Sequence, residues 1–193
     1  MEQTNKLTLD AFEATEGILH GHFLLTSGRH ADTYMQCAKL FVDPRYSEPL
    51  VEALAAQLKG VAVDYVASPA VGGIVFGYAL ARVLGVKNVF SERVDGVMTL
   101  RRGFSIPRGA NVLAVEDVVT TGGSVREVVA LARAAGANVT GVASIVDRSG
   151  GAVAFDVPFY HLLSMQIQSF DAHECPLCAQ GLPVVKPGSR NLK

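Results

Sequence analysis

The sequence has few charged residues and no excess of either sign. Charged side chains make up 18% of its 193 residues, and the formal net charge is −1 at pH 7. Because no block of lysine or arginine provides a basic surface, nucleic acid is not expected as a partner. Hydrophobic residues make up 49% of the chain, which is typical of a globular protein rather than a disordered one.

Long apolar runs are also lacking. No segment approaches the roughly 20 apolar residues that a membrane-spanning helix needs, so no membrane is expected as a partner. The N-terminal sequence MEQTNKLTLD is polar and lacks the apolar centre of a signal peptide. The three cysteines, Cys37, Cys175 and Cys178, are too few for a disulfide framework, and they favour a cytoplasmic location.

Two common nucleotide-binding motifs are missing from the chain. A Walker loop needs a lysine directly after a glycine, but no lysine occurs between Lys87 and Lys186. The Gly-x-Gly-x-x-Gly fingerprint of dinucleotide sites is absent after the first strand. Neither motif explains how this chain would hold a phosphorylated ligand.

Apolar segments alternate with amphipathic segments along most of the sequence. Strands are predicted at 23–25, 63–67, 86–90, 111–115 and 139–146. Helices are predicted at 8–20, 44–58, 74–84 and 123–135, whereas the polar stretch 91–109 shows no clean pattern. This alternation predicts one α/β domain over 1–193, with a mainly parallel twisted sheet and helices on both faces. Ligands of such sheets bind beyond the carboxyl ends of the strands.

The segment NVLAVEDVVTTGGSV, residues 111–125, carries the strongest functional signal. An apolar strand runs into Glu116 and Asp117, and residues 120–124 then open a helix. Taken alone, such a turn is also typical of an ordinary helix cap. Two acids beside an apolar core are costly unless a partner satisfies them, and the hydroxyls of a sugar could do so. Since glycines at a helix N-terminus suit a phosphate, the segment predicts a ribose-5-phosphate site.

Residues 112–124 resemble the phosphoribosyl-diphosphate motif of the type I phosphoribosyltransferases. Two further segments resemble the orotate phosphoribosyltransferases: FLLTSGRHADTY (23–34) their N-terminal signature, and ASPAVGGIVFGYALA (67–81) their pyrophosphate loop. Arg148 follows Asp147 where that family places a base-binding arginine. The resemblance implies transfer of ribose 5-phosphate from phosphoribosyl diphosphate to orotate. The products would be pyrophosphate and orotidine 5′-monophosphate, in de novo pyrimidine (UMP) biosynthesis.

The resemblance also implies a role for each loop of the site. Glu116, Asp117 and Arg93 would be the catalytic residues, with the two acids orienting the ribose. The backbone of 120–124 would hold the 5′-phosphate, and that of 70–73 would face the pyrophosphate. The implied contacts to phosphoribosyl diphosphate are Ala70, Val71, Gly72, Gly73, Arg93, Glu116, Asp117, Val118, Val119, Thr120, Thr121, Gly122, Gly123 and Ser124.

Thr120 and Arg148 would contact orotate. The carboxylate of orotate suits the planar, bidentate guanidinium group of an arginine. Without the family, Arg148 would fit an ordinary surface turn equally well. Mg²⁺ would be bound mainly through phosphoribosyl diphosphate, so no side chain of this chain is assigned as a metal ligand.

Residues 92–104 resemble the mobile loop that closes over the site in this family, often from the partner subunit of a dimer. We therefore expect a homodimer in which this lid loop serves the partner's site. Arg93 matches the family's loop arginine, whereas Val94 replaces a lysine that is usual there. Gly72 and Thr26 also stand near positions where many members have lysine, so the identity of the catalytic cation stays open.

The two ends of the chain are expected to form a small hood, from about 1–40 and 150–193. The C-terminal end contains Cys175-x-x-Cys178 with His173 nearby, which is half of a zinc site. The pair fits either an adventitious spacing or a metal shared across a dimer. The other histidines show no ligand spacing; they are His20, His22, His30 and His161.

Two other functions stay open at this point. One is a phosphoribosyltransferase for another base, which Arg148 and the segment 23–34 argue against. The other is a non-enzymatic regulator that senses phosphoribosyl diphosphate with the same fold. Such a regulator is expected to have a basic face for nucleic acid, and the net charge near zero weighs against it.

Overall fold

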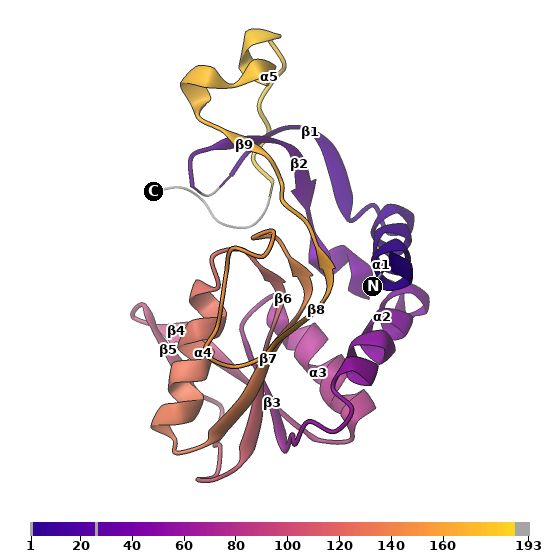
Figure 1. Ribbon diagram of the computed structural model, residues 1–193. Helices are drawn as coiled ribbons and strands as arrows, with labels where there is room; N and C mark the ends of the chain where they lie inside the picture. Colours follow the sequence, from indigo (N-terminus) through magenta and orange to yellow (C-terminus); the bar gives the residue numbers. More distant parts are fainter. Residues whose placement is uncertain (1, 26, 188–193) are drawn as a thin grey trace.

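The computed structural model describes residues 2–25 and 27–187, and its larger part is built on a six-stranded sheet (Figure 1). The strand order is β5-β4-β3-β6-β7-β8. Only β5 is antiparallel to its neighbour, so the predicted mainly parallel sheet is confirmed. The strands are β3 (Tyr65–Pro69), β4 (Lys87–Val94), β5 (Val97–Leu100), β6 (Asn111–Val119), β7 (Asn138–Asp147) and β8 (Phe159–Ser164).

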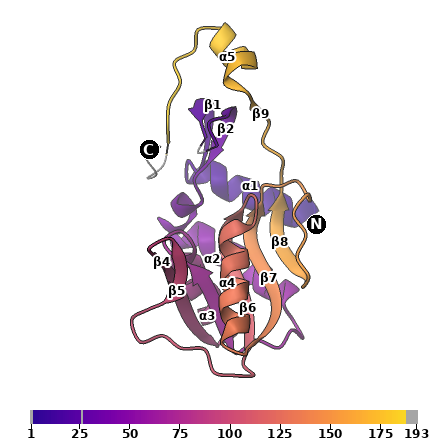
Figure 2. The same ribbon diagram turned by 90° about the vertical axis from the view of Figure 1, so that its left-hand side faces the viewer.

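Helices cover both faces of this sheet, as the sequence predicted (Figures 1 and 2). The long helices are α1 (Glu2–Ala14), α2 (Pro44–Gln57), α3 (Gly73–Leu84) and α4 (Gly123–Ala134). The first three share one apolar core with Leu113 of β6, whereas α4 packs with Val112 and Ala114 in a second core. Successive residues of β6 therefore face opposite cores, which explains why the strand is apolar without alternation.

A smaller antiparallel sheet lies at one end of the molecule, at the top of Figure 1. It contains β1 (Ile18–Leu24), β2 (His30–Met35) and β9 (Ser169–Phe170), and short helical turns accompany it. The turns are η1 (Cys37–Phe41), η2 (Ala172–Glu174) and α5 (Pro176–Ala179). Of the segments expected to form the hood, these strands and α5 lie in this part, whereas β8 belongs to the main sheet. Across residues 2–25 and 27–187, no helix has the length and apolar character needed to cross a membrane.

The helix predicted at 8–20 is wrong in its second half. Helix α1 ends at Ala14, and the chain turns at Glu16, whose φ is 52°. The Gly17 N–H closes the turn on the Phe12 carbonyl at 2.7 Å. Ile18 then pairs with Met35 of β2, so a strand forms where apolar spacing alone suggested a longer helix.

The absence of regular structure expected for 91–109 is wrong for residues 91–100, whereas 101–109 form neither helix nor strand. Strand β4 continues to Val94 and turns back into β5 as an antiparallel hairpin. Asp95 and Gly96 form the turn with φ values of 51° and 84°. Positive φ at both central residues is typical of a type I′ turn, for which Asp-Gly is a preferred sequence. The segment VDGV, residues 94–97, therefore has a sequence typical of a hairpin turn. The arginines on both sides of it made the strand pattern hard to recognise.

Candidate functional site

Three loops predicted to contribute to the site meet at one edge of the main sheet. Strand β6 lies between β3 and β7, and all three are parallel, so their carboxyl ends are neighbours. The loop 70–72 follows β3, the loop 120–122 follows β6, and Arg148 follows β7. The Arg148 N–H donates to the Val119 carbonyl at 2.8 Å, which joins the last two loops directly.

Asp117 and Gly72 come into close contact at this edge. A Cβ atom built on Gly72 would lie 3.0 Å and 3.1 Å from the two carboxylate oxygens of Asp117. Burial raises the pKa of Asp117, although the N–H groups of Val118 and of Asp117 itself partly offset the shift. A dehydrated carboxylate favours a cation or hydroxyl donors as partners. Glycine at position 72 leaves the space in which such a partner could approach.

The loop 120–122 leads into α4 in a way that only glycine permits. Gly122 has φ of 74°, and a Cβ there would lie 3.1 Å from Val153 Cγ1 and 3.2 Å from Phe155 Cζ. Helix α4 begins at Gly123, so its first N–H groups lack partners within the helix. Thr120 and Thr121 are exposed beside them. The loop therefore offers N–H and hydroxyl donors to an anion.

A cavity of about 520 Å³ opens between this edge and the small sheet. It brings together Thr120 and Arg148, the two residues predicted to contact orotate. Its described lining residues are Leu24, Leu25, Ser27, Tyr34, Thr120, Thr121, Arg148 and Pro187. The mixture of apolar walls and few polar groups is typical of a small-molecule site.

Arg148 is the principal charged group of this cavity. Its side chain is half-buried, and burial lowers its pKa, while Tyr34 and Cys37 act in the opposite direction. Within the described part of the chain, no carboxylate forms an ion pair with it. A partly dehydrated guanidinium group without a counter-ion provides a receptor for a carboxylate.

Asp147 holds the turn that presents Arg148. Its carboxylate accepts hydrogen bonds from the Ser149 N–H and hydroxyl, from the Gly151 N–H, and from the Ser164 hydroxyl, at 2.6–3.2 Å. Burial raises its pKa, but these hydrogen bonds together outweigh burial and lower it. Asp147 is therefore a positioning residue, and its partners Gly151 and Ser164 were not singled out in the sequence.

The other predicted contact residues differ in how they could reach a ligand. The Val71 side chain is 82% exposed, and Gly73 begins α3. In contrast, the Val119 side chain is fully buried, and its carbonyl already accepts a hydrogen bond from the Arg148 N–H. Val118 is half-buried against the core. Thr26 lies outside the described residues.

Arg93 lies apart from the cavity. It is not among the described residues that line the cavity, and it pairs with Glu127 of α4 at 2.7 Å. It also donates to the Gly96 carbonyl within the hairpin at 3.1 Å. Both partners of the ion pair are substantially exposed, so the pair is worth about 0–1 kcal/mol and can be exchanged for another contact.

Five lining residues of the cavity were missed as individual site residues, and one of them is Pro187 of the C-terminal segment. The other four, Leu24, Leu25, Ser27 and Tyr34, come from β1, from the turn after it and from β2, and they line the cavity with Thr120, Thr121 and Arg148 of the main sheet. All four belong to the segment 23–34, whose resemblance to an N-terminal family signature was the available signal. These residues line the same cavity only because the small sheet packs beside the loops of the main sheet, and the sequence does not show that packing.

Comparison with known proteins shows extensive similarity. A family model described as phosphoribosyl transferase domain matches residues 45–176. The orotate phosphoribosyltransferase of Caldanaerobacter subterraneus is 55% identical over 184 residues, which cover 95% of this chain and 97% of the relative. That of Thermotoga maritima is 50% identical over 184 residues, covering 95% and 98% of the two chains.

Solved structures share the fold at lower identity. The orotate phosphoribosyltransferase of Aeropyrum pernix superposes with a TM-score of 0.70 at 23% identity, covering 81% of this chain and 92% of that one. The adenine phosphoribosyltransferase of Saccharomyces cerevisiae gives 0.64 at 23% identity, covering 79% and 98%. Since enzymes for different bases share this fold, the fold by itself does not select the base.

Proposed function

The chain belongs to the orotate phosphoribosyltransferase family, and we infer that it transfers ribose 5-phosphate from phosphoribosyl diphosphate to orotate. The products are orotidine 5′-monophosphate and pyrophosphate, and the reaction belongs to de novo pyrimidine (UMP) biosynthesis. The observation that carries the choice of orotate is Arg148, a half-buried cation in the cavity with no carboxylate partner in the described chain. A purine has no carboxylate to offer it.

In this proposal, the loops at the carboxyl ends of β3, β6 and β7 divide the substrate between them. The N–H groups at the start of α4 and the hydroxyls of Thr120 and Thr121 hold the 5′-phosphate. Glu116 and Asp117, at the end of β6, orient the ribose hydroxyls. The backbone of 70–73 binds the pyrophosphate, at the loop where Gly72 approaches Asp117. In this proposal C1 of the ribose lies near a base held by Arg148, so catalysis is mainly positional and electrostatic.

Mg²⁺ fits the donor groups at this edge. Asp117 offers carboxylate oxygens, the ligand type that Mg²⁺ prefers, and burial raises its pKa although two backbone N–H groups partly offset the shift. Asp117 and Glu116 would approach the ion or its water shell, while phosphoribosyl diphosphate supplies most of the ligands. When bound, Mg²⁺ neutralises the pyrophosphate leaving group.

We also propose a cytoplasmic homodimer in which the lid hairpin, residues 92–104, closes over the partner's site. The three cysteines, all within the described part of the chain, form no disulfide, which supports a reducing location. Arg93 on this hairpin is not among the described lining residues of the cavity, and its contacts are an exposed ion pair with Glu127 and a hydrogen bond to the Gly96 carbonyl. It is therefore available to a pyrophosphate group brought close by a second subunit.

A panel of bases tests the proposed function. The protein is incubated with phosphoribosyl diphosphate and Mg²⁺ together with orotate, uracil, adenine, guanine or hypoxanthine, and pyrophosphate release is followed. We expect release with orotate and little with the other bases. If purines were consumed and orotate ignored, the base assignment would be wrong. If no base released pyrophosphate, the regulator would become the better hypothesis.

Subunit mixing tests the shared lid. Arg93→Ala and Asp117→Asn chains, each nearly inactive alone, are mixed under conditions that allow subunit exchange. If the lid crosses the dimer, each mixed dimer has one site with both residues intact, so about a quarter of the wild-type activity should return. Failure to recover activity, with exchange demonstrated by differently tagged chains, would show that each hairpin serves its own subunit.

A further inference from the structure

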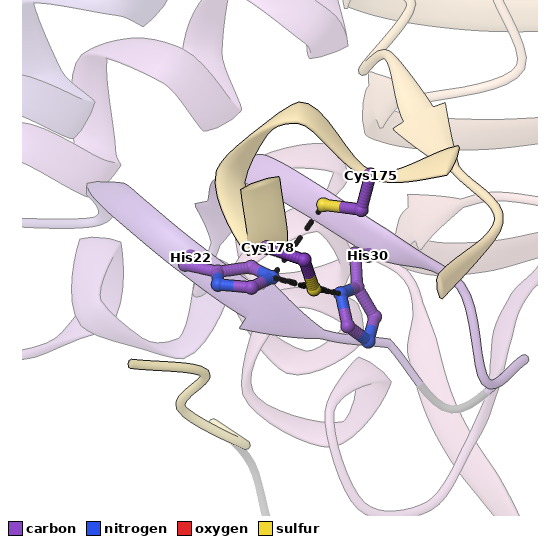
Figure 3. Close-up of side chains that lie close together, drawn as sticks. All are labelled: His22, His30, Cys175 and Cys178. Atoms are coloured by element: carbon purple, nitrogen blue, oxygen red, sulfur yellow. Dashed lines mark hydrogen bonds between the residues drawn. The ribbon is translucent and has the colours of Figure 1, made fainter. Parts of the chain in front are cut away.

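Two histidines and two cysteines meet where the C-terminal segment crosses the small sheet (Figure 3). His22 belongs to β1 and His30 begins β2, whereas Cys175 precedes α5 and Cys178 lies within it. One potential ligand atom from each residue lies within 4.8 Å of the other three. Cys175 and both histidines are buried, so the cluster is shielded from solvent on most sides.

The spacing of these atoms is close to that of one tetrahedral metal centre. Cys178 Sγ lies 3.3 Å from His30 Nδ1 and 3.7 Å from His22 Nε2, and Cys175 Sγ lies 3.6 Å from His22 Nε2. Zinc bonds of about 2.0–2.1 Å to nitrogen and about 2.3 Å to sulfur place tetrahedral ligands roughly 3.3–3.8 Å apart. The two imidazole nitrogens, 2.7 Å apart, would separate slightly on metal binding.

A further contact orients one of the imidazole rings. His22 Nδ1 lies 2.8 Å from the Leu182 carbonyl oxygen, just beyond α5. Because a carbonyl can only accept, Nδ1 carries the proton and the lone pair of Nε2 points into the cluster. Metal-binding histidines commonly donate their other N–H to a carbonyl or carboxylate in this way.

We propose that His22, His30, Cys175 and Cys178 bind one Zn²⁺ ion in each chain. Four protein ligands close the coordination shell, so the centre is structural and leaves no position for a substrate. Binding displaces the protons of the two thiols and leaves a neutral centre. The half-site seen in the sequence is completed by two histidines of the same chain, and no second subunit is needed.

The C-terminal segment 171–187 has little apolar burial to hold it against the small sheet. Cys175 is the only buried residue in this segment, while Leu182 and Val185 are 44% and 54% exposed. Strand β9 pairs with β2 over only two residues. Since apolar burial contributes little here, a metal link between the segment and the β1–β2 hairpin would supply much of its stability.

The zinc centre also has a consequence for the cavity. Leu24 and Leu25 reach the cavity from the end of β1, and Pro187 reaches it from the C-terminal segment. The metal would link the β1–β2 hairpin to the C-terminal segment, and so would hold the small sheet over the bound base. This consequence rests on the proposed function, whereas metal binding itself does not.

Metal analysis of the purified protein tests the proposal directly. The protein is expressed with zinc in the medium, purified without chelators, and measured by elemental mass spectrometry. We expect about one zinc per chain, bound tightly enough to survive gel filtration. The zinc content should fall at least tenfold in His30→Ala and Cys178→Ser. His173→Ala is the matched control, because His173 is exposed and outside the cluster although only two residues from Cys175.

Cobalt substitution provides a readout that does not depend on a variant folding. Wild-type protein stripped with a chelator and desalted should bind Co²⁺ with the visible bands of a tetrahedral ion and a thiolate charge-transfer band. Amide hydrogens of 171–187 should exchange about tenfold faster in the stripped protein and recover on adding zinc. Orotate KM should rise in parallel if the proposed function is correct.

Three results would overturn the zinc proposal. The first is a zinc content no higher than in His30→Ala, with no uptake of added metal. The second is an octahedral Co²⁺ spectrum without thiolate bands. The third is a Cys175–Cys178 disulfide as the resting state of freshly purified protein. An unchanged orotate KM with zinc demonstrated would instead leave the metal site intact and contradict only its link to the cavity.

Discussion

Replacing Asp117 with asparagine should lower kcat about 10²- to 10³-fold without destabilising the protein. The substitution keeps the shape of the side chain next to Gly72 but removes the charge that, in the proposed function, orients ribose and attracts Mg²⁺. Steady-state kinetics with orotate and phosphoribosyl diphosphate would measure the loss. Thermal unfolding of the same preparations would measure stability.

The stability of this variant should depend on pH in a definite direction. Burial raises the pKa of Asp117 in the folded state, so ionising this group costs folding free energy, and the cost appears as pH rises through the folded pKa. Asparagine carries no such cost. At neutral pH the variant should therefore melt at the same temperature as the wild type or higher, and the difference should shrink in acid.

Asp64→Asn is the matched control for this experiment. Asp64 lies before β3 and accepts a hydrogen bond from the Asn111 N–H, at the opposite end of β6 from Asp117. Its replacement should leave kcat close to the wild-type value. A parallel fall of melting temperature and activity in Asp117→Asn would assign that residue a structural role instead.

Replacing Arg148 with alanine should raise the KM for orotate roughly ten- to a hundredfold. Loss of a charge-assisted contact with a carboxylate costs about 1.5–3 kcal/mol. The KM for phosphoribosyl diphosphate should change little, because the proposal assigns the 5′-phosphate and the pyrophosphate to other loops. Initial rates over a matrix of both substrate concentrations would separate the two effects.

Two further arginine variants sharpen this test. Arg148→Lys keeps the charge but loses the planar pair of donors, so its orotate KM should lie between those of the wild type and Arg148→Ala. Arg133→Ala removes an arginine from a surface ion pair with Asp156 and should have no effect on either KM. An unchanged orotate KM in Arg148→Ala would contradict the assignment of the base site.

Much of the candidate site could be predicted from residues that are adjacent in sequence. The apolar strand, the acid pair Glu116 and Asp117, and the glycine turn at Gly122 follow one another within a single short segment. Strand ends, caps and turns are local, so their signals survive in the sequence. The alternation of helices and strands predicted the parallel sheet, and the sheet in turn brings the loops of β3, β6 and β7 together.

Other features were decided by contacts between distant parts of the chain. The sequence positions of His22 and His30 do not have the spacing of metal ligands. They become candidate ligands only because the fold places Cys175 and Cys178 beside them. The turn at Glu16 likewise ends a helix that periodicity would have continued, because Ile18 finds a strand partner in β2. Pairing and packing energies of this kind depend on which segments meet in space. Local sequence therefore determined the glycine turn and the two acids, and the tertiary structure alone decided which residues cover the cavity and which could hold that cover in place.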